Sequence, residues 1–302
     1  MKRFLSEGSL IAMEPSFEHR LADGYGKLSA RLKEAGDYLV GHPIDAATRS
    51  LRSVADESGL APATFTRLAK ALDYENFEAL RESMRAQIGR RVTSFASRAD
   101  ALQRAPSEEP GTLLQRNRDA AVANIENLAS EIDGAQLDAT VARLCHARRV
   151  VVMGGLGSTG IAEYSTYMAN FLAENWQQAG RMGASLGSAL CGLDERDALF
   201  VITKPPYARA SIQAAEMARA QGVFVVVVTD SHTCPALRAA HSGFIVPSDS
   251  PNFFSSYVAT LFLIETIMAM VARHAGPEAT RRIAEVERRN RDLEEVIDGR
   301  PA

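Results

Sequence analysis

The chain has 302 residues, of which 46% are hydrophobic and 24% are charged, as is typical of a soluble globular protein with one large domain or two modest ones. Its net charge of -3 provides no general attraction to nucleic acid, so any DNA contact must come from a local surface. The three cysteines form no metal-binding pattern, and the most apolar stretch is shorter than the roughly 20 residues of a membrane helix. We therefore expect a cytoplasmic protein without a metal site, a cofactor or a membrane partner.

The first third of the chain predicts a helical domain. Residues 1–24 carry scattered charge, Pro15 and two glycines, and they predict a flexible lead-in. A small all-helical domain is expected over residues 25–100, because apolar residues recur there at helical spacing. Its expected helices are 28–39, 51–58, 62–72 and 75–90. Prolines, a glycine and acidic residues at 101–111 then indicate a linker.

Residues 112–275 have the pattern of an α/β domain. After helices at 113–132 and 136–146, apolar or β-branched runs alternate with helix-period stretches, which predicts a parallel sheet with helices on both faces. The expected strands are 149–153, 198–203, 223–229 and 243–246, with a short strand near 176–180. The expected helices are 158–173, 209–221, 234–240 and 253–271. Residues 276–302 predict a charged helix and a tail.

Residues 53–68 read as a helix, a tight turn and a second helix. Ala55 is small enough for two helices to cross closely, and Gly59 permits the positive φ of the turn. The second helix offers small side chains, hydroxyls and cations, which suit base edges and phosphates. Its expected DNA-facing residues are Ala63, Thr64, Thr66, Arg67 and Lys70. A helical hairpin with a purely structural role has the same spacing.

Two short motifs in this region resemble the MurR/RpiR transcription regulators. One is Ala-Thr-x-x-Arg, here Ala63 to Arg67, and the other is Phe-x-x-Leu-Arg, here Phe77 to Arg81. The usual Leu-Gly of the family stands as Leu72-Asp73 in this chain. The resemblance implies an N-terminal domain that binds operator DNA, in a homodimer or homotetramer.

A glycine-rich loop follows the strand at 149–153. Gly155 and Gly157 let the backbone approach an anion, and Ser158 and Thr159 add hydroxyls, although glycines in such a turn also serve tight packing alone. The loop matches the Gly-x-Gly-x-x-Gly dinucleotide fingerprint literally. That fingerprint requires an acidic residue about 20 positions downstream, and residues 177–181 contain none. A nucleotide-binding enzyme is therefore an alternative, ranked second.

Residues 148–274 resemble the sugar isomerase (SIS) domain, which is the partner domain of the same family. The resemblance implies a three-layer α/β fold with a parallel, flavodoxin-like sheet. Many SIS domains have a Ser-x-Ser-Gly loop after the strand at 198–203, where this chain has a sequence closer to the Pro-x-Tyr-x-Arg variant of a regulator branch. Its candidate ligand-binding residues are Thr203, Lys204, Tyr207 and Arg209. Either these cations replace the lost backbone donors, or they are solvated and the phosphate site is gone.

The sequence therefore predicts a DNA-binding transcription regulator whose SIS domain senses a phosphorylated sugar or a related metabolite. The competing hypothesis is a sugar-phosphate isomerase, which needs an acid/base pair. Only His232 and Glu265 are suitable by their rough position. We expect no catalytic residues, because the helical N-terminal third has no role in an isomerase.

Overall fold

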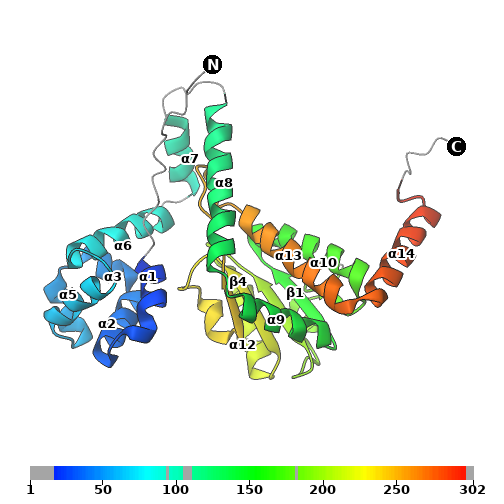
Figure 1. The fold of residues 1–302 in the computed structure, drawn as a ribbon, viewed down its shortest axis with the longest axis horizontal. Helices are drawn as coiled ribbons and strands as arrows, with labels where there is room; N and C mark the ends of the chain where they lie inside the picture. The colour runs from blue at the N-terminus through cyan, green and yellow to red at the C-terminus, as the bar shows by residue number, and fades with distance from the viewer. Residues whose placement is uncertain (1–16, 93–94, 105–110, 181–182, 297–302) are drawn as a thin grey trace, which may run out of the picture. The chain divides into compact units, whose positions relative to one another are not determined.

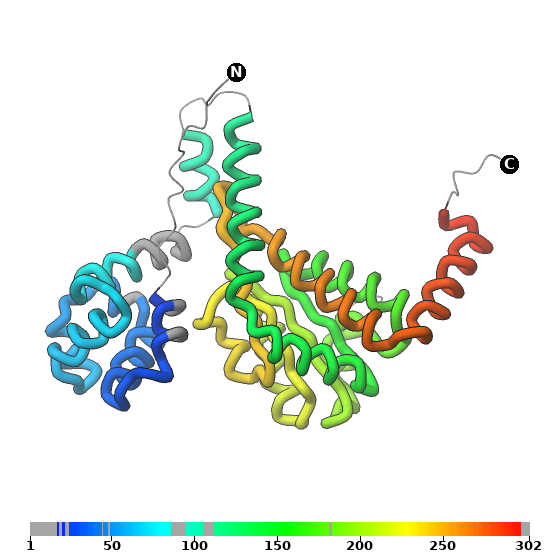
Figure 2. The backbone as a smooth tube through the Cα atoms, viewed as in Figure 1, coloured from blue at the N-terminus to red at the C-terminus, as the bar shows by residue number. Residues whose placement is uncertain are grey.

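The computed structural model describes residues 17–92, 95–104, 111–180 and 183–296. They divide into two compact units, Met1–Ser94 and Phe95–Ala302 (Figures 1 and 2). Each unit buries its own hydrophobic core, as expected for a helical domain followed by an α/β domain.

The N-terminal unit is entirely helical in its described part. Its helices are α1 (Phe17–Gly24), α2 (Ala30–Gly41), α3 (Pro43–Thr48), α4 (Leu51–Ser58), α5 (Pro62–Ala71) and α6 (Phe77–Val92), with a 3-10 turn, η1 (Tyr25–Lys27). The rings of Tyr38 and Phe77 pack edge-on against Phe65 at the centre of the core. Gly59 ends α4 with a φ of 70° and donates its N–H to the carbonyl of Ala55, so the predicted turn between α4 and α5 is confirmed.

Two predicted domain boundaries differ from the structure. The helical unit already includes α1, because Phe17 and Leu21, one helical turn apart, are buried in its core. The predicted lead-in of residues 1–24 is therefore too long. The second unit begins with α7 (Phe95–Arg104), which contacts Asn252 and Phe254 of the same unit, so the predicted linker at 101–111 starts inside a helix. Residues 105–110 of that linker lie outside the described residues.

The C-terminal unit is built on a parallel sheet of five strands in the order β2-β1-β3-β4-β5. The strands are β1 (Val150–Gly154), β2 (Trp176–Gln178), β3 (Ala198–Ile202), β4 (Phe224–Thr229) and β5 (Ser242–Ile245). Val150 lies opposite Trp176 on one side and Ala198 on the other, which makes β1 the strand where the order reverses. The order is flavodoxin-like, as predicted.

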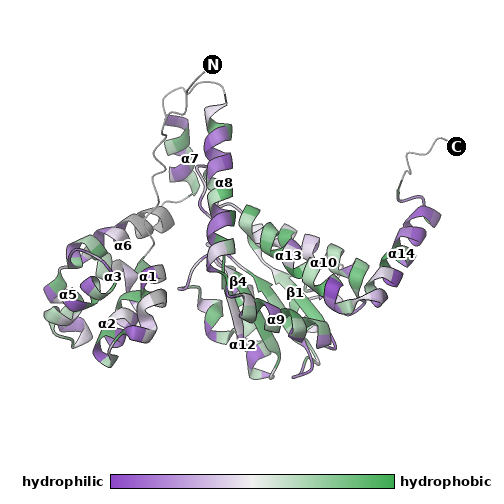
Figure 3. Ribbon diagram, in the orientation of Figure 1, coloured by the Kyte–Doolittle hydropathy of each residue, from purple (hydrophilic) through white to green (hydrophobic). Residues whose placement is uncertain are grey.

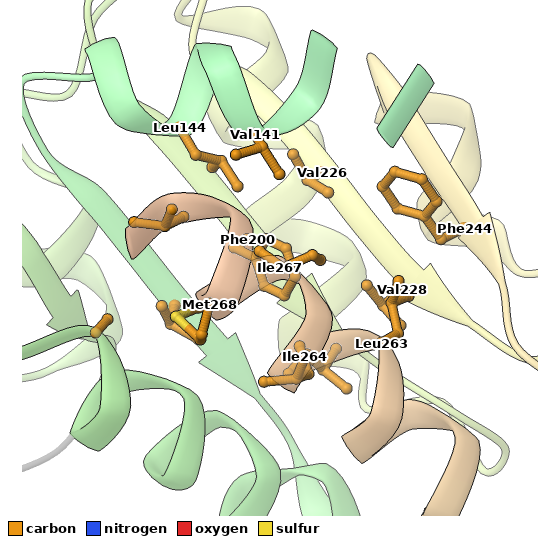
Figure 4. Close-up of a cluster of buried hydrophobic side chains, with 14 of the residues drawn as sticks. Val141, Leu144, Phe200, Val226, Val228, Phe244, Leu263, Ile264, Ile267 and Met268 are labelled. Atoms are coloured by element: carbon orange, nitrogen blue, oxygen red, sulfur yellow. The ribbon is translucent and has the colours of Figure 1, made fainter. Parts of the chain in front are cut away.

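Helices cover both faces of this sheet. The helices that follow α7 are α8 (Thr112–Glu131), α9 (Gly134–His146), α10 (Thr159–Leu172), α11 (Leu186–Leu190), α12 (Arg209–Ala220), α13 (Val258–Ala275) and α14 (Pro277–Asp292), with 3-10 turns η2 (Leu156–Ser158) and η3 (Pro235–Ala239). Of these, α14 packs mainly on α10 and α13, not on the sheet (Figure 1). Side chains alternate along each strand. Phe200, Val226 and Val228 pack against α9 and α13 (Figure 4), and the intervening strand residues pack against α11, α12 and η3.

Helix α13 is the most apolar of the helices of eight or more residues that the structure describes (Figure 3). Within the described residues it alone has the length and composition of a membrane span. Core packing accounts for part of this composition, since Leu263, Ile264 and Ile267 are buried against the sheet. The helix begins at Val258, not at 253 as predicted. The preceding residues form an irregular segment, in which the N–H of Ser256 donates to the carbonyl of Ser248 over 3.0 Å.

Candidate functional site

The second helix of the helix-turn-helix presents three of its five predicted DNA-facing residues to solvent. Ala63, Arg67 and Lys70 are exposed, and Thr66 is half-buried. Thr64 is only 7% exposed, so its prediction as a residue of the exposed face is wrong. Thr64 lies on the buried side of α5, beside Phe65.

A groove of about 510 Å³ runs beside this helix. Arg31 near the start of α2 and Arg67 of α5 both line it, as does Thr64. Its complete lining is Ser29, Arg31, Leu32, Gly59, Leu60, Ala61, Thr64 and Arg67. The exposed side of α5 is thus flanked by a second cation from a different helix.

The Phe-x-x-Leu-Arg motif has a structural role in this unit. Phe77 and Leu80 are buried in the helical core. Arg81 donates to the backbone carbonyl of Arg49 over 2.8 Å and also pairs with Glu78. The motif therefore fastens α6 to the residues just before α4 and so supports the helix-turn-helix.

The second candidate site lies at the carboxyl ends of β1 and β3. Chain order reverses between these strands, and ligands of open α/β sheets bind at such a point. Here the two loops touch, because a β-carbon at Gly155 would lie 2.5 Å from the Cβ of Ala208. A β-carbon at Gly160 would meet nothing within 4 Å. The third glycine of the dinucleotide fingerprint is therefore not required here for packing.

Hydroxyl groups of the glycine loop already have partners inside the protein. Ser158 is buried and its Oγ lies 3.0 Å from the hydroxyl of Tyr257. Thr159 donates to the carbonyl of Gly154 over 3.3 Å. A β-carbon at Gly157 would lie 3.0 Å from Cζ of Phe254, so this ring covers the loop. Any anion bound here must replace or share these contacts.

A buried cation stands at the end of β3. Lys204 is 4% exposed, and its ammonium donates to the carbonyl of Ser256 over 3.0 Å and lies 4.8 Å from the ring centre of Tyr257. Burial lowers the pKa of Lys204 to about 8, although the negative charge of Asp230 opposes this shift. The hypothesis that the cations of this loop are simply solvated is therefore wrong for Lys204.

The other predicted residues of this loop have different environments. Thr203 is buried and donates its N–H to the carbonyl of Val228. Tyr207 packs partly against the core on the α12 side of the sheet. Arg209 is exposed at the first residue of α12. The loop thus combines one buried and one exposed cation.

Three polar residues near the crevice were not singled out as ligand-binding from the sequence. Tyr257 bonds to Ser158, and Asp230 accepts a hydrogen bond from Ser248 over 3.0 Å. The Oγ of Ser211 is buried without a hydrogen-bond partner, and a β-carbon at Gly155 would lie 3.1 Å from it. Asp230 could have been found from the sequence, because it directly follows a predicted strand. The local sequence around Ser211 and Tyr257 gives no comparable sign of a ligand site.

The candidate acid/base residues of an isomerase lie on separate elements of the C-terminal unit. Glu265 is exposed on α13 and accepts a hydrogen bond from the hydroxyl of Tyr164 on α10 over 3.0 Å. His232 is exposed in the loop after β4. Across residues 17–296, apart from the stretches that the structure does not describe, His, Cys, Asp and Glu form no group of three that could hold a metal ion.

Comparison with known proteins agrees with this architecture. Residues 143–270 match the family model of the SIS domain. The HTH-type transcriptional regulator YbbH of Bacillus subtilis is 22% identical over 275 residues, which cover 87% of this chain and 90% of the relative. The sugar isomerase domain of the RpiR transcription factor from Sphaerobacter thermophilus has a TM-score of 0.54 and 21% identity, and covers 59% of this chain and 99% of its own. Vibrio vulnificus NanR, solved with ManNAc-6P, also has a TM-score of 0.54, with 16% identity over 92% of this chain and 99% of its own.

Residues 143–270 of the C-terminal unit therefore match a SIS domain, and a helical unit with a helix-turn-helix precedes them in the same chain. The predicted resemblance to a regulator with a SIS domain agrees with these matches, since the SIS model covers residues 143–270 and a helix-turn-helix-type regulator aligns over most of the chain.

Removal of the buried cation should change the pH dependence of stability. Because the pKa of Lys204 falls from 10.5 to about 8 on folding, the unfolded chain binds more protons between these pH values, and stability rises with pH across that window. At pH 7 this shift corresponds to about 3 kcal/mol of destabilisation. We expect Lys204→Met to stabilise the SIS unit at pH 7 and to remove the rise between pH 8 and 10.5 in urea unfolding. A rise of the same size in the variant would contradict this assignment.

Proposed function

We propose that the protein is a transcription regulator that binds operator DNA through α5 and senses a phosphorylated sugar or related metabolite in the SIS crevice. The observation that carries the proposal is the combination of the two sites in one chain. A helix-turn-helix with exposed Arg67 and Lys70 precedes a SIS domain that holds Lys204 at its ligand-binding edge. The HTH-type relative aligns over both units. Such a regulator acts in the cytoplasm, where DNA and the metabolite are both present.

The exposed face of α5 supplies the chemistry of a DNA-reading helix. Ala63, Arg67 and Lys70 recur at spacings of four and three, so they lie along one side of the helix. Arg67 donates through Nε to the carbonyl of Ala63, which holds the side chain along this face. A guanidinium suits the base edge of guanine, and a lysine ammonium suits a phosphate. Thr66 adds a hydroxyl, and Thr64 lines the adjacent groove.

Loss of the Arg67 guanidinium should weaken DNA binding. The probe is the fragment that the parent protein selects from a random-sequence DNA library. For Arg67→Ala we expect a loss of about 1–3 kcal/mol in binding to this fragment, with relaxed specificity, as measured by fluorescence anisotropy at fixed salt. Arg219→Ala, which removes an exposed arginine at the end of α12, is the control and should bind like the parent. Selection of no fragment by the parent, or equal losses in both variants, would refute the proposed role of α5.

The crevice suits an anionic ligand that approaches from outside the two loops. Contact between Gly155 and Ala208 closes the space between them, and two prolines restrict the second loop. Lys204 can transfer its hydrogen bond from the carbonyl of Ser256 to a ligand oxygen. The proposed ligand-binding residues are Gly155, Gly157, Ser158, Thr159, Thr203, Lys204, Tyr207 and Arg209. NanR, which shares this fold, was solved with the sugar phosphate ManNAc-6P.

Phosphorylated sugars should therefore stabilise the protein, and their unphosphorylated counterparts should not. ManNAc-6P and a set of hexose 6-phosphates serve as probes in thermal-shift measurements; at 100 times its dissociation constant a ligand adds about 2.7 kcal/mol. Affinity should fall above pH 8, because the ammonium of Lys204 loses its proton there, while the phosphate stays a dianion from about pH 7 upward. Lys204→Met should weaken binding at least tenfold. A response to the neutral sugars alone, or turnover of a sugar phosphate that Glu265→Ala abolishes, would contradict the proposal.

An exposed, largely aromatic surface on α10 and α13 suits the dimerisation that a protein needs in order to bind a two-fold operator. The two helices pack together, and α13 exposes Val258 and Phe262 while α10 exposes Tyr164 and Tyr167. Tyr167 is 63% exposed in the single chain. One helix-turn-helix reads half a site, so two copies are required for a two-fold operator. We assign this aromatic face to a homodimer, and a homotetramer would need a further face.

A charge on the aromatic face should separate the copies. We expect Tyr167→Glu to convert the dimer to a monomer at micromolar concentration in analytical ultracentrifugation, because a buried unpaired carboxylate is costly at an interface. Met217→Glu is a matched control, since Met217 is an exposed apolar residue on α12. It should leave the dimer intact. A parent protein that is monomeric at tens of micromolar, or a dimeric Tyr167→Glu variant, would exclude this interface.

A further inference from the structure

The irregular segment from Ser248 to Tyr257, here called the bridging segment, contacts the SIS crevice and the first helices of the C-terminal unit. It follows β5 and ends where α13 begins (Figure 2). Asn124 of α8 donates to the carbonyl of Asp249 over 2.7 Å and accepts from its N–H over 3.2 Å. These bonds fix the first half of the bridging segment on α8.

The second half of the bridging segment covers the glycine loop and Lys204. Tyr257 bonds to Ser158, and the carbonyl of Ser256 accepts from Lys204. The ring of Phe254 lies against Gly157. A ligand that takes the hydroxyl of Ser158 or the ammonium of Lys204 must therefore compete with the bridging segment.

The same segment holds α7. The ring of Phe95 stacks on Phe254, with centroids 4.8 Å apart and an angle of 30° between the planes. Arg98 donates to the carbonyl of Asn252 over 2.9 Å and to that of Ser250 over 3.4 Å. Phe254 is thus in contact with both the glycine loop and α7.

Helix α7 depends on such contacts because it is weakly packed. None of its residues is buried, so its attachment belongs to the low-stability end of the unit. In the sequence only positions 93 and 94 separate α7 from α6, the last helix of the helix-turn-helix unit. Helix α7 is therefore the element of the C-terminal unit that is nearest in sequence to the helix-turn-helix unit.

We propose that the bridging segment transmits occupancy of the SIS crevice to the DNA-binding unit, through the stack of Phe254 on Phe95 and the bonds of Arg98. Ligand that displaces Tyr257 and Ser256 shifts Phe254 and weakens the attachment of α7. The proposal rests on the proposed function for its regulatory meaning. The physical coupling between the glycine loop and α7 is testable without DNA or ligand.

A pair of glycine substitutions in one loop provides that test. In Gly157→Ala the new methyl group presses on Phe254 and Tyr257, at 3.0 and 3.2 Å from their nearest atoms, and so imitates a ligand. Gly160→Ala adds the same methyl group where nothing lies within 4 Å. We expect amide hydrogen exchange of residues 95–104 to accelerate about tenfold in Gly157→Ala and to stay at the parent rate in Gly160→Ala, with β3 and β4 unchanged in both variants.

Removal of the stack should abolish this response. In a protein that already carries Phe95→Ala, adding Gly157→Ala should no longer change the exchange rates of the α7 amides. Equal exchange of α7 in the parent, Gly157→Ala and Gly160→Ala would overturn the proposal, and so would an α7 that is unprotected in the parent. Acceleration that spreads to β3 and β4 would also overturn it, since it indicates general destabilisation.

DNA affinity separates this proposal from the proposed function. With the fragment selected by the parent, Gly157→Ala should change the affinity severalfold, and Gly160→Ala should not. A response of α7 in exchange without a change in DNA affinity would overturn the regulatory role of the bridging segment. Failure of the parent to select any DNA would instead refute the proposed function, while the exchange measurement still decides whether the crevice and α7 are coupled.

Discussion

The close contact between Gly155 and Ala208 is the constraint on which the ligand site depends. Helices cover both faces of the parallel sheet, so the polar chemistry of this unit is confined to the loops at the strand ends. Where the strand order reverses, the loops usually diverge and leave a crevice between them. Here they meet at a separation that only glycine permits. A ligand is therefore expected on the outer side of the loops, where Ser158 and Lys204 already bond to the bridging segment.

The buried ammonium of Lys204 is difficult to explain by packing alone. It has three donor positions, and its surroundings include one carbonyl acceptor, an aromatic ring and the charge of Asp230. An unbranched apolar side chain could fill the same space without the desolvation cost of a charge. Groups whose pKa is strongly lowered by burial are concentrated at functional sites. An incoming anion would supply the missing acceptors and the compensating charge, so the energetic strain of the unliganded site favours anion binding.

The sequence predicted the SIS fold closely because its signals are local and strong. Runs such as Val225 to Val228 are both apolar and β-branched, and each expected strand lies within two residues of the observed one. Gly59 likewise indicates its turn through its own backbone freedom. The bridging segment was missed because Phe253 and Phe254 continue the apolar pattern of α13, while the partners that hold them off the helix, Phe95 and Arg98, are more than 150 residues away in the chain. The exposure of Thr64 was predicted wrongly for a related reason. Its hydroxyl does not indicate how far the buried side of α5 extends around the helix.

The nature of the contacts limits how strongly ligand and DNA can influence each other. Coupling between two sites is reciprocal, so the factor by which ligand changes DNA affinity is also the factor by which DNA changes ligand affinity. If the DNA-binding form requires an attached α7, ligand and DNA compete; if it requires a released α7, they cooperate. In either case the coupling cannot exceed the free energy that attaches α7 to its unit. An aromatic stack and the bonds of one arginine to carbonyl groups set that limit at roughly 2–4 kcal/mol, which is enough to change affinity by one to three orders of magnitude.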